Sequence, residues 1–158
     1  MEILNKSATF NYEVLDKYQA GLVLLGHEVK AIKNGQMSLK GSYIAIKNSP
    51  TPEAYLIKSS VSLYKKAGPM PDYNPERPRK LLLTRQEINK LFAKLKQKDS
   101  TSACRRRDGL TLIPLSVYNK HNLIKLEFAL VSPKKKFDKK ESIKNREIDR
   151  QIQRALKF

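Results

Sequence analysis

The sequence predicts a mainly β protein with short helices, in which six short, mostly antiparallel strands form a small barrel or a curved sheet. Three observations lead to this class. Apolar and polar residues alternate in several short runs, as they do in half-buried strands. Turn-forming residues separate these runs at short intervals. Helical periodicity is confined to short segments, and a length of 158 residues suits one domain with its own core.

The first third of the chain predicts two strands and a helix. Residues 10–15 alternate in hydrophobicity, and residues 20–25 form a short apolar run that ends at Gly26. Residues 27–34 fit a short helix, and Gly35 suits the left-handed residue that follows a helix end. Residues 42–47 and 54–59 then predict two strands joined by a turn that contains Pro50 and Pro52.

The remainder of the body predicts a loop, a helix and a strand pair. Four prolines make residues 67–79 an extended loop with basic residues at its exit. Thr84 and Glu87 form a capping box for a helix with apolar residues at 88, 91, 92 and 95. Residues 96–108 are polar and predict a mobile loop. Residues 109–118 and 124–131 predict two strands joined by a tight turn at 119–122.

The charge distribution favours a polyanionic partner. The formal net charge is +17 and the sequence pI is near 10.0. This positive charge is spread over the whole chain. Residues 1–131 carry 22 Lys/Arg against 11 Asp/Glu, and residues 132–158 carry ten Lys/Arg against four Asp/Glu. Such an excess indicates nucleic acid or an anionic membrane surface as the partner. No apolar run is long enough to span a bilayer and no secretion signal is visible, so we expect a cytoplasmic protein.

The residue inventory argues against an enzyme. His27 and His121 lack partners at metal-ligand spacing, and the single Cys104 excludes an internal disulfide. Cys104 precedes three arginines, which would lower a thiol pKa, but a free thiol in a polar loop is the commoner situation. There is no phosphate-binding glycine loop and no nucleophile elbow. We therefore expect no catalysis, no cofactor and no metal.

Glu28 and the basic residues of the body each allow two interpretations. Glu28 opens a predicted helix, where the helix dipole favours an acid, but it is also a possible acceptor for a base amino group or a ribose hydroxyl. The cations at 30, 33, 77, 79, 80 and 105–107 are either an ordinary solvated surface or, with interleaved tyrosines, an RNA-binding face.

Residues 132–158 form a basic tail with too few apolar residues for a core. Ile148, Ile152, Ala155 and Leu156 would make a narrow stripe on a helix. That stripe either docks on the body or stays frayed until the basic faces meet phosphate. The second alternative is favoured, because isolated helices of this length are marginal in water.

Several separate blocks resemble one family, the SsrA-binding proteins (SmpB) that partner bacterial transfer-messenger RNA. The longest block is AGLVLLGHEVKAIKNG at residues 20–35, and a second is RPRKLLL at 77–83. Shorter matching stretches lie at 5–6, 39–43, 111–118 and 134–146. Their order and spacing make the resemblance much more specific than any single motif.

The resemblance implies an OB-like, six-stranded antiparallel β-barrel over residues 1–131. It also implies a tail over residues 132–158 that is disordered when free and helical on the ribosome. The implied function is binding of the tRNA-like domain of transfer-messenger RNA and its delivery to stalled ribosomes for trans-translation. The partners would be that RNA and the decoding centre and message channel of the ribosome, with no membrane, and the protein would be a monomer.

The resemblance also assigns residues to two roles. The RNA-binding residues of the body would be Asn5, Lys6, Glu28, Lys30, Lys33, Arg79, Lys80, Leu81 and Leu82. The ribosome-binding residues of the tail would be Lys134, Lys135, Lys136, Asp138, Lys139, Lys140, Ile143, Lys144 and Arg146. The sequence departs from the family pattern at Ser132 and Pro133, where a glycine is usual, which predicts a stiffer hinge. It departs again at Lys140, where an arginine is usual and a bidentate contact is lost.

Two other classes of protein remain open from the sequence. A ribosomal protein would share a basic body with a basic extension, and it would stay with ribosomes through a high-salt wash. A membrane-surface protein would need an amphipathic tail helix, but the narrow stripe and the lack of tryptophan argue against it.

Overall fold

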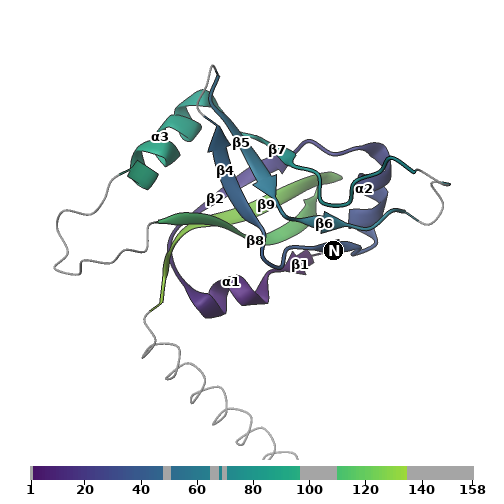
Figure 1. Ribbon diagram of the computed structural model, residues 1–158, viewed down its shortest axis with the longest axis horizontal. Helices are drawn as coiled ribbons and strands as arrows, with labels where there is room; N and C mark the ends of the chain where they lie inside the picture. Colours follow the sequence, from purple (N-terminus) through teal and green to yellow (C-terminus); the bar gives the residue numbers. More distant parts are fainter. Residues whose placement is uncertain (1, 48–50, 65–67, 69–70, 97–109, 135–158) are drawn as a thin grey trace, which may run out of the picture.

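The computed structural model of the protein describes residues 2–47, 51–64, 68, 71–96 and 110–134 (Figure 1). Its helices and strands follow one another along the chain in this order: β1 (Glu2–Leu4), α1 (Lys6–Asn11), β2 (Tyr12–Leu22), α2 (Gly26–Lys33), β3 (Met37–Ser38), β4 (Tyr43–Lys47), β5 (Glu53–Ile57), β6 (Ser60–Val61), β7 (Arg79–Leu82), α3 (Arg85–Lys96), β8 (Thr111–Lys120) and β9 (Leu123–Pro133). The predicted class, mainly β with short helices, is confirmed.

Six strands close into a ring. Their order is β8-β4-β5-β7-β2-β9, and β9 pairs with β8 again to complete the circuit. All these pairings are antiparallel. The predicted number of six strands describes this ring, but β1 adds to the outer side of β8, and β3 pairs with β6 in a separate ladder. In Figure 1, α2 and α3 lie at opposite ends of the molecule.

The main core fills the ring because alternate residues of each strand point inward. On β9 the inward residues are Ile124, Leu126, Phe128 and Leu130. The opposite face of β8 and β9 is also buried: Ile113, Leu115, Ala129 and Val131 pack with Ala8 of α1 in a second cluster. The β8–β9 pair is therefore covered on both faces, which explains its long apolar runs.

The predicted strands at 10–15 and 20–25 are wrong in two respects. Phe10 and Asn11 belong to α1, whose Ala8 packs in the second cluster. The residues from Tyr12 onward form one continuous strand, because β2 pairs with β9 over nearly its whole length. A bulge between Val14 and Asp16 shifts the register within this strand. The polar residues Asp16, Lys17 and Gln19, in the middle of this strand, made one strand look like two.

The other predicted elements are confirmed within a residue or two. α2 is followed by Gly35 at φ +77°, in the left-handed region. The capping box of α3 forms, since the Thr84 amide donates to the Glu87 carboxylate at 2.8 Å and the Glu87 amide to the Thr84 hydroxyl at 3.3 Å. The β8–β9 turn contains exposed His121 at φ +49°. The loop before β7 contains turns, and its basic exit becomes the strand β7.

Three predictions concern residues outside the described part of the chain. These are the centre of the turn at 48–50, the loop at 97–109 with Cys104, and the tail from residue 135 onward. The predicted hinge residues Ser132 and Pro133 are described, and they lie in β9, paired with Glu13 and Tyr12. Lys134 follows them with its backbone amide donating to Asn11 at 3.2 Å.

Candidate nucleic-acid interface

The strand β7 separates its four residues between two environments. Arg79 and Leu81 point inward and are 0% and 2% exposed. Lys80 and Leu82 point outward, and Leu82 is 60% exposed. The RKLL segment, which sequence resemblance treats as one block, therefore has an interior pair and a surface pair.

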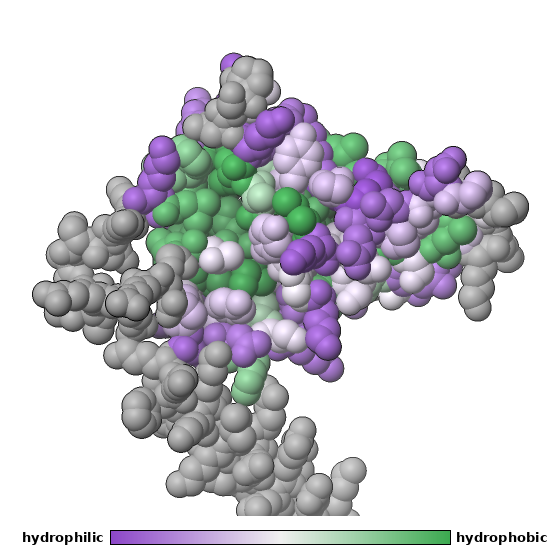
Figure 2. Space-filling view, viewed as in Figure 1, coloured by the Kyte–Doolittle hydropathy of each residue, from purple (hydrophilic) through white to green (hydrophobic). Residues whose placement is uncertain are grey.

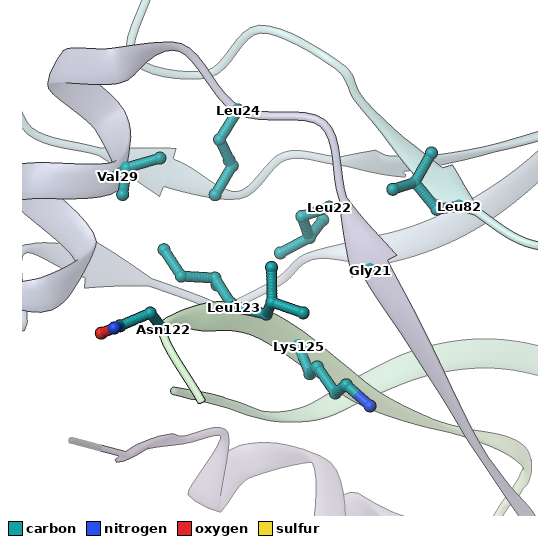
Figure 3. Close-up of a pocket in the computed structure, with 9 residues that line it drawn as sticks. Gly21, Leu22, Leu24, Val29, Leu82, Asn122, Leu123 and Lys125 are labelled. Atoms are coloured by element: carbon teal, nitrogen blue, oxygen red, sulfur yellow. The ribbon is translucent and has the colours of Figure 1, made fainter. Parts of the chain in front are cut away.

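An apolar hollow of about 270 Å³ lies beside the outward residue Leu82 (Figure 3). Leu22, Leu24 and Val29 contribute from the end of β2 and the start of α2. Leu123, Ile124 and Lys125 contribute from the start of β9, and Gly21 and Asn122 complete the lining. Leu82 and Leu123 are among the exposed large hydrophobic residues of the described chain. The hollow is thus an apolar surface open to solvent.

Lysines lie around this hollow and on the helix that forms one wall of it. Lys125 lines the hollow itself. Lys30 and Lys33 are exposed on α2, and the Lys30 ammonium lies 5.8 Å from the centre of the Tyr64 ring. Lys80, between Arg79 and Leu81, forms an ion pair with Glu53 at 2.5 Å. Figure 2 shows hydrophilic side chains gathered over the part of the molecule where α2 and β6 lie in Figure 1.

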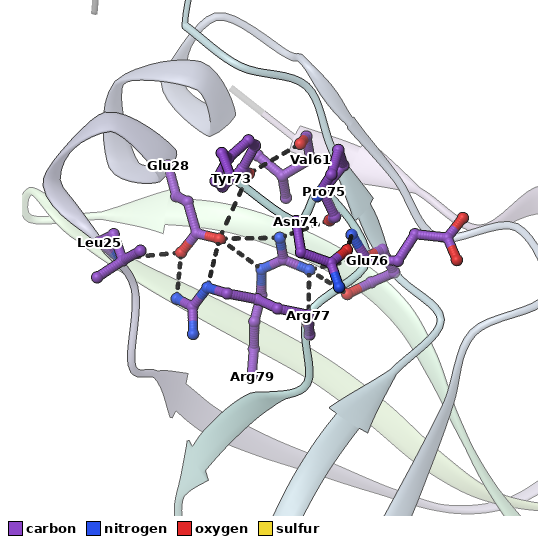
Figure 4. Close-up of polar contacts among 10 residues, drawn as sticks. Leu25, Glu28, Val61, Tyr73, Asn74, Pro75, Glu76, Arg77 and Arg79 are labelled. Carbon is purple, nitrogen blue, oxygen red and sulfur yellow. Dashed lines mark hydrogen bonds and ion pairs between the residues drawn. The ribbon is translucent and has the colours of Figure 1, made fainter. Parts of the chain in front are cut away.

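Glu28 lies behind the hollow, in the first turn of α2, and its carboxylate is saturated with donors from its own chain (Figure 4). One oxygen, Oε1, accepts from Arg77 Nε at 2.9 Å and from Arg79 Nη2 at 2.9 Å. The other oxygen, Oε2, accepts from the Leu25 backbone amide at 2.9 Å and from Arg77 Nη2. The Tyr73 hydroxyl donates a long bond to Oε1 at 3.5 Å. Because an ionised carboxylate offers about four lone-pair sites, little acceptor capacity is left for another molecule.

The Arg79 guanidinium is equally well satisfied. Its Nη1 donates to the Ser59 carbonyl at 2.7 Å and to the Ser59 hydroxyl at 3.0 Å. Its Nη2 donates to the Pro75 carbonyl at 2.8 Å as well as to Glu28. A buried ion pair is tolerated where the remaining donors and acceptors also find partners, and this pair meets that condition.

The arginines decide the ionisation of Glu28. Burial acts to raise the pKa of its carboxyl group, because the charged form loses hydration. Hydrogen bonds from Arg77, from the Leu25 amide and from Arg79 outweigh burial, so the pKa lies below its usual value. Glu28 is therefore charged at neutral pH, and it lies in the first turn of α2, as predicted.

The structure divides the predicted RNA-binding residues of the body by exposure. Lys6, Lys30, Lys33, Lys80 and Leu82 are exposed, and Asn5, Glu28, Arg79 and Leu81 are buried. Asn5 has a structural explanation: its side-chain amide donates to the carbonyls of Pro114 at 2.9 Å and Leu39 at 3.2 Å. Direct contact with RNA stays a prediction for all nine residues.

Sequence reasoning missed several residues of this region. Leu24, Leu123 and Lys125 line the hollow, and Tyr73 joins the Glu28 cluster. None of them stands out locally, because their roles depend on the closure of the ring. Of the predicted tail residues, Lys134 is described, with its ammonium donating to the Thr9 carbonyl at 3.1 Å. The other tail residues, from Lys135 to Arg146, lie outside the described part of the chain.

Two searches of the described residues gave no site of another kind. They contain no group of three or more His, Cys, Asp or Glu residues that could hold a metal ion. No helix among them is both long and apolar enough to cross a membrane.

These features define a class: small cationic proteins, mainly β, that present an open apolar surface beside lysines, an arrangement suited to binding nucleic acid. The family model described as "SmpB protein" matches residues 2–158. The chain therefore belongs to the SmpB family.

Individual relatives agree over nearly the full length. The chain is 42% identical over 153 residues to the SsrA-binding protein of Trichodesmium erythraeum, with 97% of this chain and 90% of the relative covered. It is 40% identical over 154 residues to the SsrA-binding protein of Thermosipho africanus, with 97% and 94% covered. A solved structure described as "tmRNA-SmpB: a journey to the center of the bacterial ribosome" matches with a TM-score of 0.65 at 32% identity, covering 90% of this chain and 94% of that one.

Proposed function

We propose that this protein binds the tRNA-like domain of transfer-messenger RNA and delivers it to stalled ribosomes for trans-translation. The observation that carries the proposal is 42% identity to an SsrA-binding protein over 97% of this chain. The related structure of a tmRNA–SmpB complex on the bacterial ribosome supports both partners, the RNA and the ribosome.

The hollow beside β7 is the part of the body best suited to the RNA. Its apolar wall of Leu24, Leu82 and Leu123 offers a surface on which an unstacked base or a ribose can pack. Lys125 at the hollow, with Lys30, Lys33 and Lys80 nearby on α2 and β7, supplies cations for the phosphates. Lys6 is a further exposed cation, on α1.

The closed ring of six antiparallel strands is consistent with an OB-like barrel, and we propose that description for the body. The chain would then consist of an RNA-binding domain, residues 1–131, and a basic ribosome-binding tail, residues 132–158. β9 continues to Pro133, so the functional boundary falls close to the end of this strand. In this division the tail cations and Asp138 contact the decoding centre and the message channel.

The proposal describes a binding factor and no catalysis. Such a factor would work as a monomer in the cytoplasm, where both the RNA and the ribosomes are found. The net charge of +17 supports a role that depends on phosphate neutralisation.

A salt titration tests the RNA-binding part of the proposal. The affinity of the full chain for the isolated tRNA-like RNA should fall by orders of magnitude between about 50 and 200 mM salt, since several phosphates are neutralised. An unrelated structured RNA of equal length is the control for non-specific attraction. A weak salt dependence, or equal affinity for the two RNAs, would contradict the proposal.

A deletion tests the division between body and tail. Removal of residues 135–158 keeps β9 and Lys134 and should leave binding to the isolated tRNA-like RNA within a few-fold of the full chain. The same deletion should abolish peptide tagging on stalled ribosomes. Equal loss of both activities would show that the division of labour is wrong.

A further inference from the structure

We infer that Glu28 is a positioning residue, whose carboxylate fastens the first turn of α2 to β7 and thereby fixes the shape of the RNA-binding hollow. The inference has two parts. The fastening concerns the free protein and stands on geometry alone. The consequence for RNA rests on the function proposed above.

The first step is that the walls of the hollow and the ion cluster belong to the same elements. Val29 lines the hollow and is the neighbour of Glu28 in α2. Leu82 lines the hollow and lies three residues after Arg79 in β7. The Glu28–Arg79 ion pair, at 2.9 Å, therefore joins one wall of the hollow to another from behind.

The second step is that Arg77 and Tyr73 extend the fastening to the loop before β7. Arg77 holds both oxygens of Glu28, and the Tyr73 hydroxyl donates to the Val61 carbonyl at 2.9 Å. The Pro75 carbonyl accepts from Arg79. The loop before β7 is thus tied to α2 through the Glu28 carboxylate, to β6 through Tyr73 and to β7 through Pro75. We call the four residues Glu28, Arg77, Arg79 and Tyr73 the Glu28 clamp.

The third step argues against the simplest alternative, direct recognition of RNA by the carboxylate. Glu28 is 0% exposed, and both of its oxygens are occupied by donors of its own chain. An RNA hydroxyl or amino group would have to displace an arginine from a buried site. Leaving a buried arginine without its partner is strongly unfavourable, so the carboxylate acts through the position of its neighbours.

One backbone hydrogen bond allows the strength of the clamp to be measured in the RNA-free protein. The Val23 amide, in the link between β2 and α2, donates to the Lys80 carbonyl of β7 at 3.0 Å, just beyond the β2–β7 ladder. This bond therefore joins the segment that leads into α2 to the strand that carries Arg79. If the clamp holds the walls together, its loss should free this amide. Hydrogen exchange at Val23 in the RNA-free protein then measures the fastening without reference to function.

The main variant is Glu28→Gln, which keeps the shape of the side chain and removes its charge. We expect exchange at the Val23 amide to accelerate at least tenfold more than exchange at Phe128, which lies in the core of the ring and reports global stability. We expect the affinity for the tRNA-like RNA to fall at least tenfold, with an unchanged dependence on salt, because no phosphate-binding cation is removed.

Two further variants keep the inference testable if Glu28→Gln folds poorly. Glu76→Gln makes the same substitution at an exposed position of the same loop, and it should change neither exchange nor affinity. Arg77→Gln removes a half-buried member of the clamp and should accelerate exchange at Val23. If Arg77 acts through Glu28, the double variant Glu28→Gln/Arg77→Gln should bind RNA within about twofold of Glu28→Gln alone, because coupled residues are not additive.

Three outcomes would overturn the inference. Weaker RNA binding by Glu28→Gln with unchanged Val23 exchange would mean that the carboxylate contacts RNA itself. Unchanged RNA affinity in that variant would mean that the hollow does not depend on the clamp. A smaller salt dependence in Arg77→Gln would make Arg77 a phosphate contact. If the unmodified chain fails to bind the RNA, the proposed function fails, and Val23 exchange still decides whether the clamp exists.

Discussion

The two faces of β7 place their basic residues in different environments, one buried and one exposed to solvent. On the inner face, Arg79 is fully buried and all its donor groups are used by Glu28, Ser59, Pro75 and Arg77. On the outer face, Lys80 pairs with Glu53 while its side chain remains 44% exposed. Desolvation makes the inner charge dependent on its partner, whereas water screens the outer charge. Adjacent cations in one strand can therefore serve folding and surface binding separately.

The largest expected effect comes from breaking the inner ion pair. Arg79→Met should lower the free energy of unfolding by about 3–5 kcal/mol, because the buried Glu28 carboxylate loses a charged partner. Urea unfolding at pH 7 measures this loss. Lys80→Met, on the outer face of the same strand, is the matched control and should change the free energy of unfolding much less than Arg79→Met. Equal losses in the two variants would remove the distinction between the faces.

The two leucines of β7 test the same difference between the inner and outer faces, with no charged group involved. Leu81→Ala should cost about 2–5 kcal/mol of unfolding free energy, because Leu81 is 2% exposed in the main core. Leu82→Ala should cost less than about 1 kcal/mol, since its side chain is already largely in water, and should instead weaken binding of the tRNA-like RNA. A large stability loss from Leu82→Ala would show that the hollow is part of the core.

Lowering the pH should reduce the stability that Glu28 contributes on the inner face of β7. The pKa of Glu28 is lowered in the folded protein, so its contribution to stability is present above the unfolded-state pKa of about 4.3. That contribution is lost as the pH falls through the lower, folded-state pKa. The difference in unfolding free energy between the unmodified chain and Glu28→Gln should therefore narrow between pH 7 and pH 3. A difference that stays constant over this range would mean that the charge of Glu28 does not stabilise the fold.

The smallest effect is expected from Lys80→Ala. Its exposed ion pair with Glu53 should contribute little to stability, because water screens the two charges. If Lys80 neutralises one phosphate, the slope of log affinity against log salt should become smaller by about 0.7–0.9. Filter binding over a salt series measures this slope, and Lys17→Ala, an exposed lysine on β2, serves as the control. An unchanged slope would remove Lys80 from the interface.

The sequence predicted the elements whose signals are local. The capping box of α3 and the alternation of β9 lie within a few residues, and both are observed. The length of β2 was missed because its continuity depends on pairing with β9 and on a bulge. Four strands were missed, β1, β3, β6 and β7, because each is only two to four residues long.

In the candidate site, too, features with a local signal could be predicted and features that depend on long-range contacts could not. Exposed lysines such as Lys30 and Lys33 could be assigned to a basic surface from composition, and the structure leaves them exposed. The partner of Glu28 could not be found in this way, because Arg79 lies 51 residues away and the two meet only when β7 joins the ring. The hollow likewise exists only where β2 and β7 end and β9 begins, beside α2, so Leu123 and Lys125 carried no local signal.

The length of the strand β2 sets the distance between the hollow and the end of β9. Its last residues, Gly21 and Leu22, line the hollow, and its first residue, Tyr12, pairs with Pro133 at the end of β9. β2 has 11 residues at about 3.3 Å each, so these two points lie roughly 35 Å apart along the strand. Lengthening β2 and β9 together by two residues would move the two ends about 7 Å further apart while keeping the inward and outward faces in phase. If the hollow binds RNA and the tail binds the ribosome, as proposed, the residue count of β2 sets the distance between the RNA site and the start of the tail.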